Sequence, residues 1–321
     1  MKVAVIYGGI SSEREVSLKS GKAILDNLDK NKYEVVDCRI DEMTDAFKID
    51  SNVDIALIGL HGKFGEDGSI QSILEAKGIK YCGCNPLTSG ILMDKNYTKT
   101  IARQNGLLTA DWTSVKSVEE IDYDLIDKMG YPVFIKPNSG GSSVATFFIK
   151  DKKDVENAVR EGLKYDEIVL IEKYVKGVEY TSFILNGEVF PTIKITSDNE
   201  FFDFEAKYST TNGAREEVVE LEEDLDEKLK EASKTCWRIF NCKGYVRVDY
   251  IITENKDVYL LELNTLPGMT ETSLIPKSAK ARGIEYAGLL DKLIESSLYI
   301  DIKKKKKRSV CNFFCKLAFY G

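Results

Sequence analysis

The chain has 321 residues, enough for about two domains with a buried core. With 43% hydrophobic residues, 30% charged residues and only six prolines, the composition is that of a globular protein. It excludes collagen-like, disordered and disulfide-stapled classes. Seven cysteines without a C-x-x-C pair argue for a reducing, cytoplasmic setting and against a thiolate metal site.

The formal charge of −7 is distributed unevenly along the chain. Residues 301–321 hold seven basic side chains and one acidic one, which leaves 38 basic and 51 acidic side chains, a charge of −13, in residues 1–300. That charge disfavours binding to nucleic acid, although a local basic cleft for phosphates is still allowed. No run of about 18 apolar residues occurs, so no integral membrane segment is expected, and the first apolar stretch is too short for a signal peptide.

Short apolar strands alternate with helices in the first 90 residues, which predicts an open parallel α/β sheet. Ser12 and Glu15 have the spacing of a capping box, so a helix is expected from Ser12 to about Asp29. Ligands of such a sheet bind at the carboxyl ends of its strands. Gly8-Gly9 lacks the G-x-G-x-x-G spacing, so dinucleotide binding is not favoured. The strands are expected at Val3–Tyr7, Tyr33–Ile40 and Val53–Leu60.

After a helix around Ser89–Asn105 the pattern becomes rich in strands, which predicts an α+β arrangement. Residues Phe201–Val219 have no clear period and predict a long loop, of a length that often serves as a lid. Strands are expected at Val133–Lys136, Val144–Ile149, Ile168–Val175, Glu179–Leu185, Gly244–Thr253 and Val258–Asn264. Helices are expected at Lys152–Leu163 and Glu222–Phe240 and over roughly Ser273–Ser297.

Four polar residues on the last two strands form the most informative pattern. Side chains alternate across a strand, so Arg247 shares a face with Asp249, and Glu262 shares one with Asn264. A two-residue turn at Asn255-Lys256 would place Asp249 opposite Glu262 and Arg247 opposite Asn264. The intervening apolar residues would bury the other face: Val246, Val248, Tyr250, Leu261 and Leu263.

Two carboxylates directly opposite each other repel unless a proton or a cation lies between them. The oxygen ligands of Asp249, Glu262 and Asn264 favour Mg²⁺ or Mn²⁺ over Zn²⁺. An ordinary solvated polar face of a sheet is an equally good interpretation of these residues taken alone.

Three loops supply further candidate contacts, each with a plainer alternative. Lys136–Ser143 could place backbone N–H groups on phosphate, or it could be a simple hairpin connection. Glu172 and Glu179, around a turn, could accept hydrogen bonds from an adenine amine and a ribose hydroxyl, or lie on the surface. The only histidine opens the glycine-rich loop His61–Gly68 and could be a general base or structural. Glu13 would point into the same crevice, or interact only with the helix dipole.

Taken in order, six motifs resemble those of the D-alanine–D-alanine ligases, which are ATP-grasp enzymes. The resemblance spans residues 1 to about 300 and implies an N-terminal open parallel α/β (pre-ATP-grasp) domain followed by a two-lobed α+β ATP-grasp fold. The motifs are Gly8-Gly9 with Ser12–Leu18, His61–Gly68, Lys136–Ser143, Glu205–Tyr208, Gly244–Asp249 and Glu262–Leu274. The expected domains are 1–93 for substrate, 94–182 as the central lobe, 183–300 as the C-terminal lobe with the metal and acceptor sites, and a basic and aromatic tail at 301–321.

The resemblance implies that the carboxylate of one D-alanine attacks the γ-phosphate of ATP. The amine of a second D-alanine then displaces phosphate from the acyl phosphate, which gives D-alanyl-D-alanine for peptidoglycan precursors. ATP, D-alanine, two Mg²⁺ (or Mn²⁺) ions, a cytoplasmic location and a homodimer are expected. An acceptor of D-serine or D-lactate is the alternative, although Tyr208 after Lys207 favours D-alanine. A non-catalytic nucleotide-binding relative should have lost a metal ligand, and none is missing.

The resemblance also assigns a role to each candidate residue. ATP would be held by Lys95, Lys136, Ser143, Glu172, Lys173, Val175, Glu179 and Lys207. Two metal ions would be held by Asp249, Glu262 and Asn264. The first D-alanine would place its ammonium on Glu13 with His61 nearby, and the carboxylate of the second would lie on Ser273 and Leu274. Arg247 and the backbone of Gly268 would form the oxyanion site. Ser142 and Tyr208 would be hydrogen-bonded toward Glu13 and latch two loops over the site.

The sequence departs from the family pattern at three places. Ala145 stands where the family has glycine, which matters if the backbone there has a positive φ. The segment after Tyr208 lacks the Pro-Ala pair common there, which leaves the exit of the lid uncertain. The tail at 303–321 has no counterpart and is expected to be a disordered extension or a segment that adheres to an anionic membrane surface.

Overall fold

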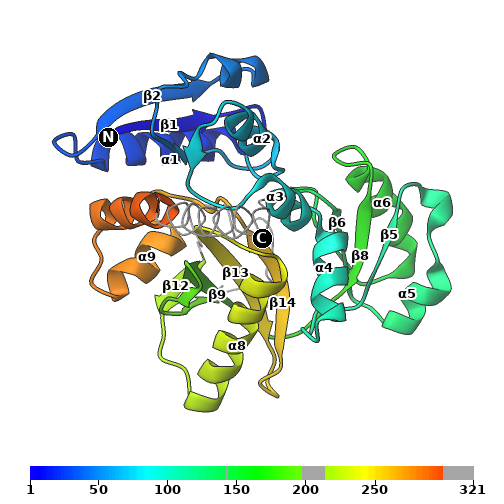
Figure 1. Cartoon of the computed structure of the whole chain (residues 1–321). Helices are drawn as coiled ribbons and strands as arrows, with labels where there is room; N and C mark the ends of the chain where they lie inside the picture. The colour runs from blue at the N-terminus through cyan, green and yellow to red at the C-terminus, as the bar shows by residue number, and fades with distance from the viewer. Residues whose placement is uncertain (142–143, 197–213, 299–321) are drawn as a thin grey trace, which may run out of the picture.

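The computed structural model describes residues 1–141, 144–196 and 214–298. The strands of these residues form three sheets, which follow one another along the chain (Figure 1). The first sheet is parallel and the other two contain antiparallel pairs. The predicted fold class, an open parallel α/β part followed by an α+β part, is therefore confirmed.

The N-terminal sheet has the strand order β2-β1-β3-β4, and its pairs are parallel. Its central strand is completely buried from Val3 to Ile6, because helices cover it. The strands are β1 (Lys2–Gly8), β2 (Glu34–Ile40), β3 (Ile55–Ile58) and β4 (Lys80–Tyr81), and the helices are α1 (Arg14–Asn27), η1 (Met43–Lys48) and α2 (Ser69–Ala76).

The predicted capping box at the start of α1 is wrong. The helix begins at Arg14, and Glu13 occupies the N-cap position without a side-chain capping bond. The Oγ of Ser11 instead accepts the backbone N–H of Glu13 at 3.1 Å.

The central sheet has the order β5-β8-β6-β7 and is antiparallel. One of its faces packs on α5 and α6 through a core that includes Val133, Ile135 and Ile171. Its strands are β5 (Trp112–Val115), β6 (Val133–Pro137), β7 (Phe147–Ile149) and β8 (Val169–Lys173), and its helices are α5 (Tyr123–Met129), η2 (Val118–Glu120), η3 (Lys152–Asp154) and α6 (Val155–Gly162). Strand β7 is shorter than the predicted Val144–Ile149 because residues 144 and 145 form a turn.

Two short helices connect the first two sheets. The single helix predicted around Ser89–Asn105 is divided at Asp94 into α3 (Pro86–Met93) and α4 (Lys95–Gln104). Asp94 is extended, and its side chain caps α4 by accepting the N–H of Tyr97. This break gives α4 its own direction, and Lys95 becomes its first residue.

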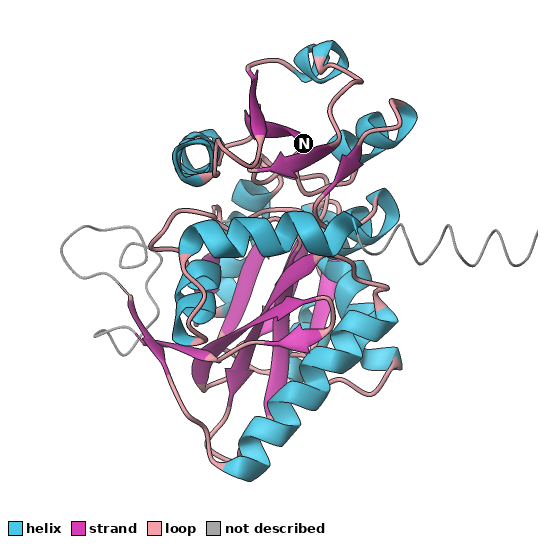
Figure 2. Ribbon diagram, turned by 60° about the vertical axis from the view of Figure 1, so that its left-hand side comes forward, coloured by secondary structure: helices cyan, strands magenta, loops and turns pink. Residues whose placement is uncertain are grey.

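The C-terminal sheet has the order β12-β11-β9-β13-β14, with β10 beside β9. Figure 2 shows its strands in magenta with helices beside them. Its strands are β9 (Val178–Leu185), β10 (Glu188–Val189), β11 (Ile193–Thr196), β12 (Arg215–Val218), β13 (Tyr245–Ile252) and β14 (Val258–Asn264). Its helices are α8 (Glu223–Ile239), α9 (Leu274–Ala281) and the helical residues 286–298. Strand β12 lies inside the segment predicted to be a loop, which is a correction for residues 215–218.

The predicted domain limits of 93, 182 and 300 remain predictions, although the limit at 182 falls within a strand. Strand β9 contains residue 182, and it pairs with β13 along its whole length. The chain therefore passes from the central to the C-terminal sheet before residue 178. None of the helices in the described ranges is long and apolar enough to cross a membrane.

The predicted pairing of β13 with β14 is confirmed, but the predicted turn is wrong. Asp249 lies opposite Glu262, and Arg247 lies opposite Asn264. The turn has three residues rather than two, since Thr253 donates its N–H to Asp257 O. A β-bulge next to Tyr250 restores the register, because Leu261 is the extra residue there. Leu261 consequently lies in the pocket described below instead of on the buried face.

Gly21, in the middle of α1, tests how closely this helix packs on the N-terminal sheet. A Cβ added there would lie 2.1 Å from Cγ of Tyr7. Alanine has the higher helix propensity, but we expect Gly21→Ala to lower the free energy of unfolding by about 1–3 kcal/mol through overpacking. Denaturant unfolding measures this. Lys22→Ala, at the exposed next position, is the control, and a stabilised Gly21→Ala would contradict the packing argument.

Candidate active site

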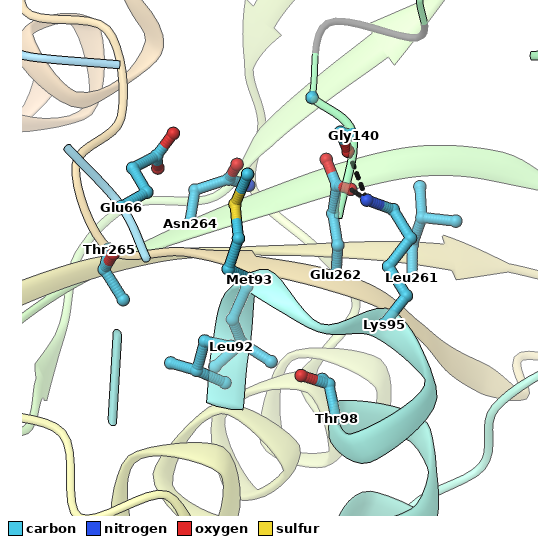
Figure 3. A pocket seen from close by; sticks show the side chains of 12 residues that line it. Glu66, Leu92, Met93, Lys95, Thr98, Gly140, Leu261, Glu262, Asn264 and Thr265 are labelled. Carbon is cyan, nitrogen blue, oxygen red and sulfur yellow. Dashed lines mark hydrogen bonds and ion pairs between the residues drawn. The ribbon is translucent and has the colours of Figure 1, made fainter. Parts of the chain in front are cut away.

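A pocket that is partly open to solvent lies where the three parts of the chain meet. Figure 3 shows Glu66, Lys95, Glu262 and Asn264 around it. Its lining comes from the loop before α2, from α3 and α4, from the loop after β6 and from the end of β14. The lining residues are Glu66, Leu92, Met93, Lys95, Thr98, Gly140, Gly141, Leu261, Glu262, Leu263, Asn264 and Thr265.

Asp249 is the most tightly held carboxylate at this site, with 2% of its surface exposed. The guanidinium of Arg247 donates to both of its oxygens, with the Nη2–Oδ2 distance at 2.7 Å. Thr181 donates to Oδ1 at 2.6 Å, and the amide of Asn264 donates to Oδ2 at 3.0 Å. The pKa of Arg247, which burial alone would lower, is raised by Asp249.

Glu262 and Lys95 face each other more loosely across the pocket. Their charged atoms lie 3.9 Å apart, and Nζ of Lys95 also donates to the backbone oxygen of Gly140 (Figure 3). Burial lowers the pKa of Lys95, although the charge of Glu262 opposes the shift. A polyanion that enters the pocket would therefore favour the charged form of Lys95.

Glu172 lies on the central sheet between two ammonium groups. Lys136 Nζ lies 2.8 Å from Oε1, and Lys99 Nζ lies 2.7 Å from Oε2. Burial alone would raise the pKa of Glu172, but the two cations outweigh it and lower the pKa to about 2. Lys99 was not predicted from the motifs, although its position four residues after Lys95 places both on one face of α4.

The remaining predicted nucleotide residues lie around the junction of β8 and β9. Lys173 ends β8 with an exposed side chain, and its backbone N–H donates to Asp111 O at 2.8 Å. Val175 is half-buried in the connection. Glu179 is 8% exposed and lies on β9, in the C-terminal sheet. The predicted ATP-binding residues therefore lie on both sides of the connection between the central and the C-terminal sheets.

The Glu13 carboxylate lies against the backbone of two loops. A Cβ added to Gly62 or to Gly141 would lie 2.7 Å from Oε2 of Glu13. Glycine is required at both positions for this close approach. The structure therefore brings Glu13 together with Gly141 of the predicted phosphate loop.

His61 is a buried structural histidine with both ring nitrogens engaged. Nδ1 lies 2.7 Å from Leu266 O, which can only accept, so Nδ1 carries the proton. Nε2 lies 2.8 Å from Ser20 Oγ, which itself accepts the N–H of Met269. Burial lowers the pKa of His61 to about 4, so the ring is neutral near pH 7. The general-base interpretation is not supported, because the ring ties α1 to the loop after β14.

Glu66 is a pocket residue that the motif analysis missed. Its carboxylate accepts the N–H of Gly62 at 2.8 Å and that of Leu266 at 3.3 Å. Burial and the nearby charge of Glu13 raise the pKa of Glu66 to about 8. An acidic residue in the loop that follows a buried parallel strand was the available signal.

The predicted acceptor residues lie at the start of α9. Ser273 is the N-cap residue, and its hydroxyl lies 2.7 Å from Thr270 Oγ1. A Cβ on Gly268 would lie 3.2 Å from Ser273 Oγ, which places these two predicted residues together. Arg247 and Leu274 also lie around one small gap that has no room for a water molecule. Its lining residues are Thr181, Phe183, Ile193, Arg247, Leu274, Ile275 and Ser278.

Ala145 has a φ of 53°, in the left-handed region that favours glycine. The departure from the family glycine therefore introduces strain next to the predicted phosphate loop. Several predicted features lie outside the described residues: Ser142, Ser143, Lys207, Tyr208 and the tail at 301–321.

The neutral state of His61 makes stability depend on pH. Its pKa is about 4 in the folded chain and about 6.5 when unfolded, so only the unfolded state gains a proton between these values. The free energy of unfolding should therefore fall by up to about 3 kcal/mol through this group as pH drops from 6.5 to 4. Denaturant unfolding of the native chain and of His61→Gln isolates the effect, and identical pH dependence in both would contradict it.

Comparison with known proteins places this geometry in a family. The family model described as D-ala D-ala ligase C-terminus matches residues 101–295, and the one described as D-ala D-ala ligase N-terminus matches residues 2–50 and 41–84. D-alanine–D-alanine ligase B of Clostridium perfringens is 50% identical over 303 residues, which cover 94% of this chain and 100% of that protein. The D-alanine–D-alanine ligase of Clostridium botulinum is 50% identical over 301 residues, with the same coverage.

Solved structures agree with the sequence matches. The crystal structure of D-alanine–D-alanine ligase from Bacillus anthracis complexed with ATP has a TM-score of 0.86 and 42% identity, and it covers 95% of this chain and 99% of that one. A D-Ala:D-Ser ligase from Enterococcus faecalis has a TM-score of 0.82 and 27% identity, with 92% and 99% covered. The family models match both halves of the chain, and the fold agrees with the solved ligase structures. The chain therefore belongs to the D-alanine–D-alanine ligase family of ATP-grasp proteins.

Proposed function

We propose that this protein uses ATP to join two D-alanines into D-alanyl-D-alanine, through an acyl phosphate, for peptidoglycan precursor synthesis. The observation that carries the proposal is a pocket lined by Glu262 and Asn264 together with Lys95 and the loop after β6, with the buried Asp249 paired to Glu262 on the neighbouring strand. The identity of 50% with named ligases over 94% of the chain supports the reaction.

ATP would lie between the central and the C-terminal sheets. Lys95 and Lys136 supply positive charge for the phosphates, and Glu172 and Glu179 supply acceptors for the adenosine. Lys173 and Val175 lie on the connection beside them, where backbone groups can face a base. Ser143 and Lys207 complete the predicted set and lie outside the described residues.

The donors present suit a hard divalent cation such as Mg²⁺ or Mn²⁺. Glu262 faces the pocket with the Lys95 ammonium 3.9 Å away, and Asn264 donates with its nitrogen, which leaves its amide oxygen as the acceptor. Asp249 already accepts from Arg247, Thr181 and Asn264, so it would hold metal only after one of these donors leaves. Bound metal would neutralise charge on the phosphates. That two metal ions bind here remains a prediction.

Substrate positioning accounts for most of the chemistry that the residues can supply. Glu13 would bind the ammonium of the first D-alanine beside Gly62, so that its carboxylate faces ATP. Arg247 and the backbone of Gly268 would stabilise the oxyanion when the second amine attacks. Ser273 and the first N–H groups of α9 would hold the carboxylate of the second D-alanine at a helix N-terminus, where anions are favoured.

Water must be excluded while the acyl phosphate exists. We infer that Ser142 and Tyr208, hydrogen-bonded toward Glu13, close the two loops over the site. The contact between Gly141 and the Glu13 carboxylate supports this arrangement, since Gly141 precedes Ser142. A cytoplasmic location and a homodimer also remain predictions.

The acceptor assay tests the reaction. Phosphate release from ATP is measured with D-alanine alone and with D-alanine plus D-serine or D-lactate, and the products are separated. We expect D-alanyl-D-alanine as the main product in each case. A main product that contains D-serine or D-lactate would instead favour the alternative acceptors, and ATP turnover independent of D-amino acids would exclude ligation.

Glu262→Gln tests the metal edge of the pocket. The amide keeps the shape of the side chain but removes the charge, so the fold should survive while D-alanine-dependent ATP hydrolysis falls by at least about 100-fold. Glu254→Gln, on the exposed turn of the same hairpin, is the matched control and should retain activity. Near-normal turnover of Glu262→Gln in Mg²⁺ would falsify the role of this residue.

A further inference from the structure

Helix α4 carries three basic residues at intervals of four: Lys95, Lys99 and Arg103. This spacing places them along one face of the helix. Lys95 lines the pocket, and Arg103 is partly exposed and pairs with Asp111 at 2.9 Å. Lys99 lies between them with only 2% of its surface exposed. A lysine so deeply buried needs compensating contacts, and these contacts indicate what it does.

Three groups surround the Lys99 ammonium. Its Nζ lies 2.7 Å from Glu172 Oε2 and donates to Thr109 Oγ1 at 2.7 Å. It also lies 4.9 Å from the centre of the Trp112 ring, within the range of a cation–π interaction. An anion, a hydroxyl and an aromatic face therefore hold the lysine in one place.

The two cations on Glu172 differ in their surroundings. The side chain of Lys136 is 12% exposed, and Lys136 is the last residue but one of β6, the strand that leads into the predicted phosphate loop. Lys99 is buried on a helix, and its ammonium lies between Glu172 and Thr109. If Lys136 binds ATP, it shares its ammonium with the nucleotide, and Glu172, which is 4% exposed, depends on Lys99 to stay paired.

We propose that Lys99 is a positioning residue for the nucleotide: it is the fixed counter-ion that holds the Glu172 carboxylate ionised and oriented while Lys136 turns to ATP. The proposal rests on the proposed function, because it requires ATP at Lys136 and Glu172. Lys99 itself does not touch the nucleotide. It acts only through Glu172.

A consequence for base selectivity follows from the chemistry of a carboxylate. An ionised carboxylate only accepts hydrogen bonds, so Glu172 favours a base with an exocyclic amine, as in ATP, over one with a carbonyl there, as in ITP. Without Lys99 the carboxylate is held less firmly and is protonated more readily, and a protonated group can donate to a carbonyl. Loss of Lys99 should therefore reduce the ratio by which the enzyme prefers ATP over ITP.

The test compares Lys99→Met with Arg103→Met, a control on the same face of α4 that also contacts the Trp112 ring. Affinity for ADP is measured by calorimetry, and KM and kcat are measured for ATP, ITP and D-alanine. For Lys99→Met we expect ADP affinity to fall about tenfold, KM for ATP to rise similarly and the preference for ATP over ITP to fall. The KM for D-alanine and the kcat at saturating ATP should stay within about twofold, and Arg103→Met should resemble the native chain.

Removing a buried partner can unfold a chain, so a second comparison does not depend on Lys99→Met alone. Lys99→Met/Glu172→Gln removes both charges and is compared with Glu172→Gln. If Lys99 acts through Glu172, the two variants bind ADP equally. Tenfold weaker binding by the double variant, or native ADP affinity in a folded Lys99→Met, would overturn the proposal.

Failure of the proposed function gives a different result. A native chain that binds ADP but shows no D-alanine-dependent hydrolysis would overturn ligation, while the ADP comparisons would still decide the role of Lys99. A native chain that does not bind ADP would overturn both.

Discussion

The buried carboxylate of Asp249 constrains the C-terminal sheet more than any other group. With 2% of its surface exposed, it is compensated by Arg247, Thr181 and Asn264, which all donate hydrogen bonds to it. These donors come from β9, β13 and β14, so one charge fixes the register of three adjacent strands. The face that carries Glu262 is positioned as a result.

That register is reached by two irregularities that cancel. The three-residue turn before Val258 shifts β14 by one position, and the bulge at Leu261 shifts it back. Strand alternation predicted the pairing of Asp249 with Glu262 correctly, because a two-residue turn without a bulge and a three-residue turn with a bulge give the same register there. It could not predict the bulge, since Leu260, Leu261 and Leu263 are equally apolar and only packing decides which of them leaves the core.

Local pattern predicted the parallel sheet and most strands because those depend on neighbours in the sequence. The contacts that define the site are mostly distant ones. His61 is hydrogen-bonded to Leu266, 205 residues away in the sequence. Lys99, on helix α4, forms an ion pair with Glu172, on strand β8. No spacing rule identifies such partners, so the structural role of His61 and the presence of Lys99 and Glu66 in the site emerged only from the fold. The lid residues Lys207 and Tyr208 lie outside the described residues, and their roles stay predictions.

The distances between opposite charges divide the site into a frame and an edge that can respond to ligand. Arg247 with Asp249 and Lys99 with Glu172 are in direct contact at 2.7 Å and are largely buried, so a ligand cannot easily separate them. Lys95 and Glu262 lie farther apart, at 3.9 Å, and burial lowers the pKa of Lys95. A triphosphate would favour the charged form of Lys95, and a cation would offset the charge on Glu262. The pocket is therefore poised to accept both together, because each relieves a charge that the folded chain leaves incompletely balanced.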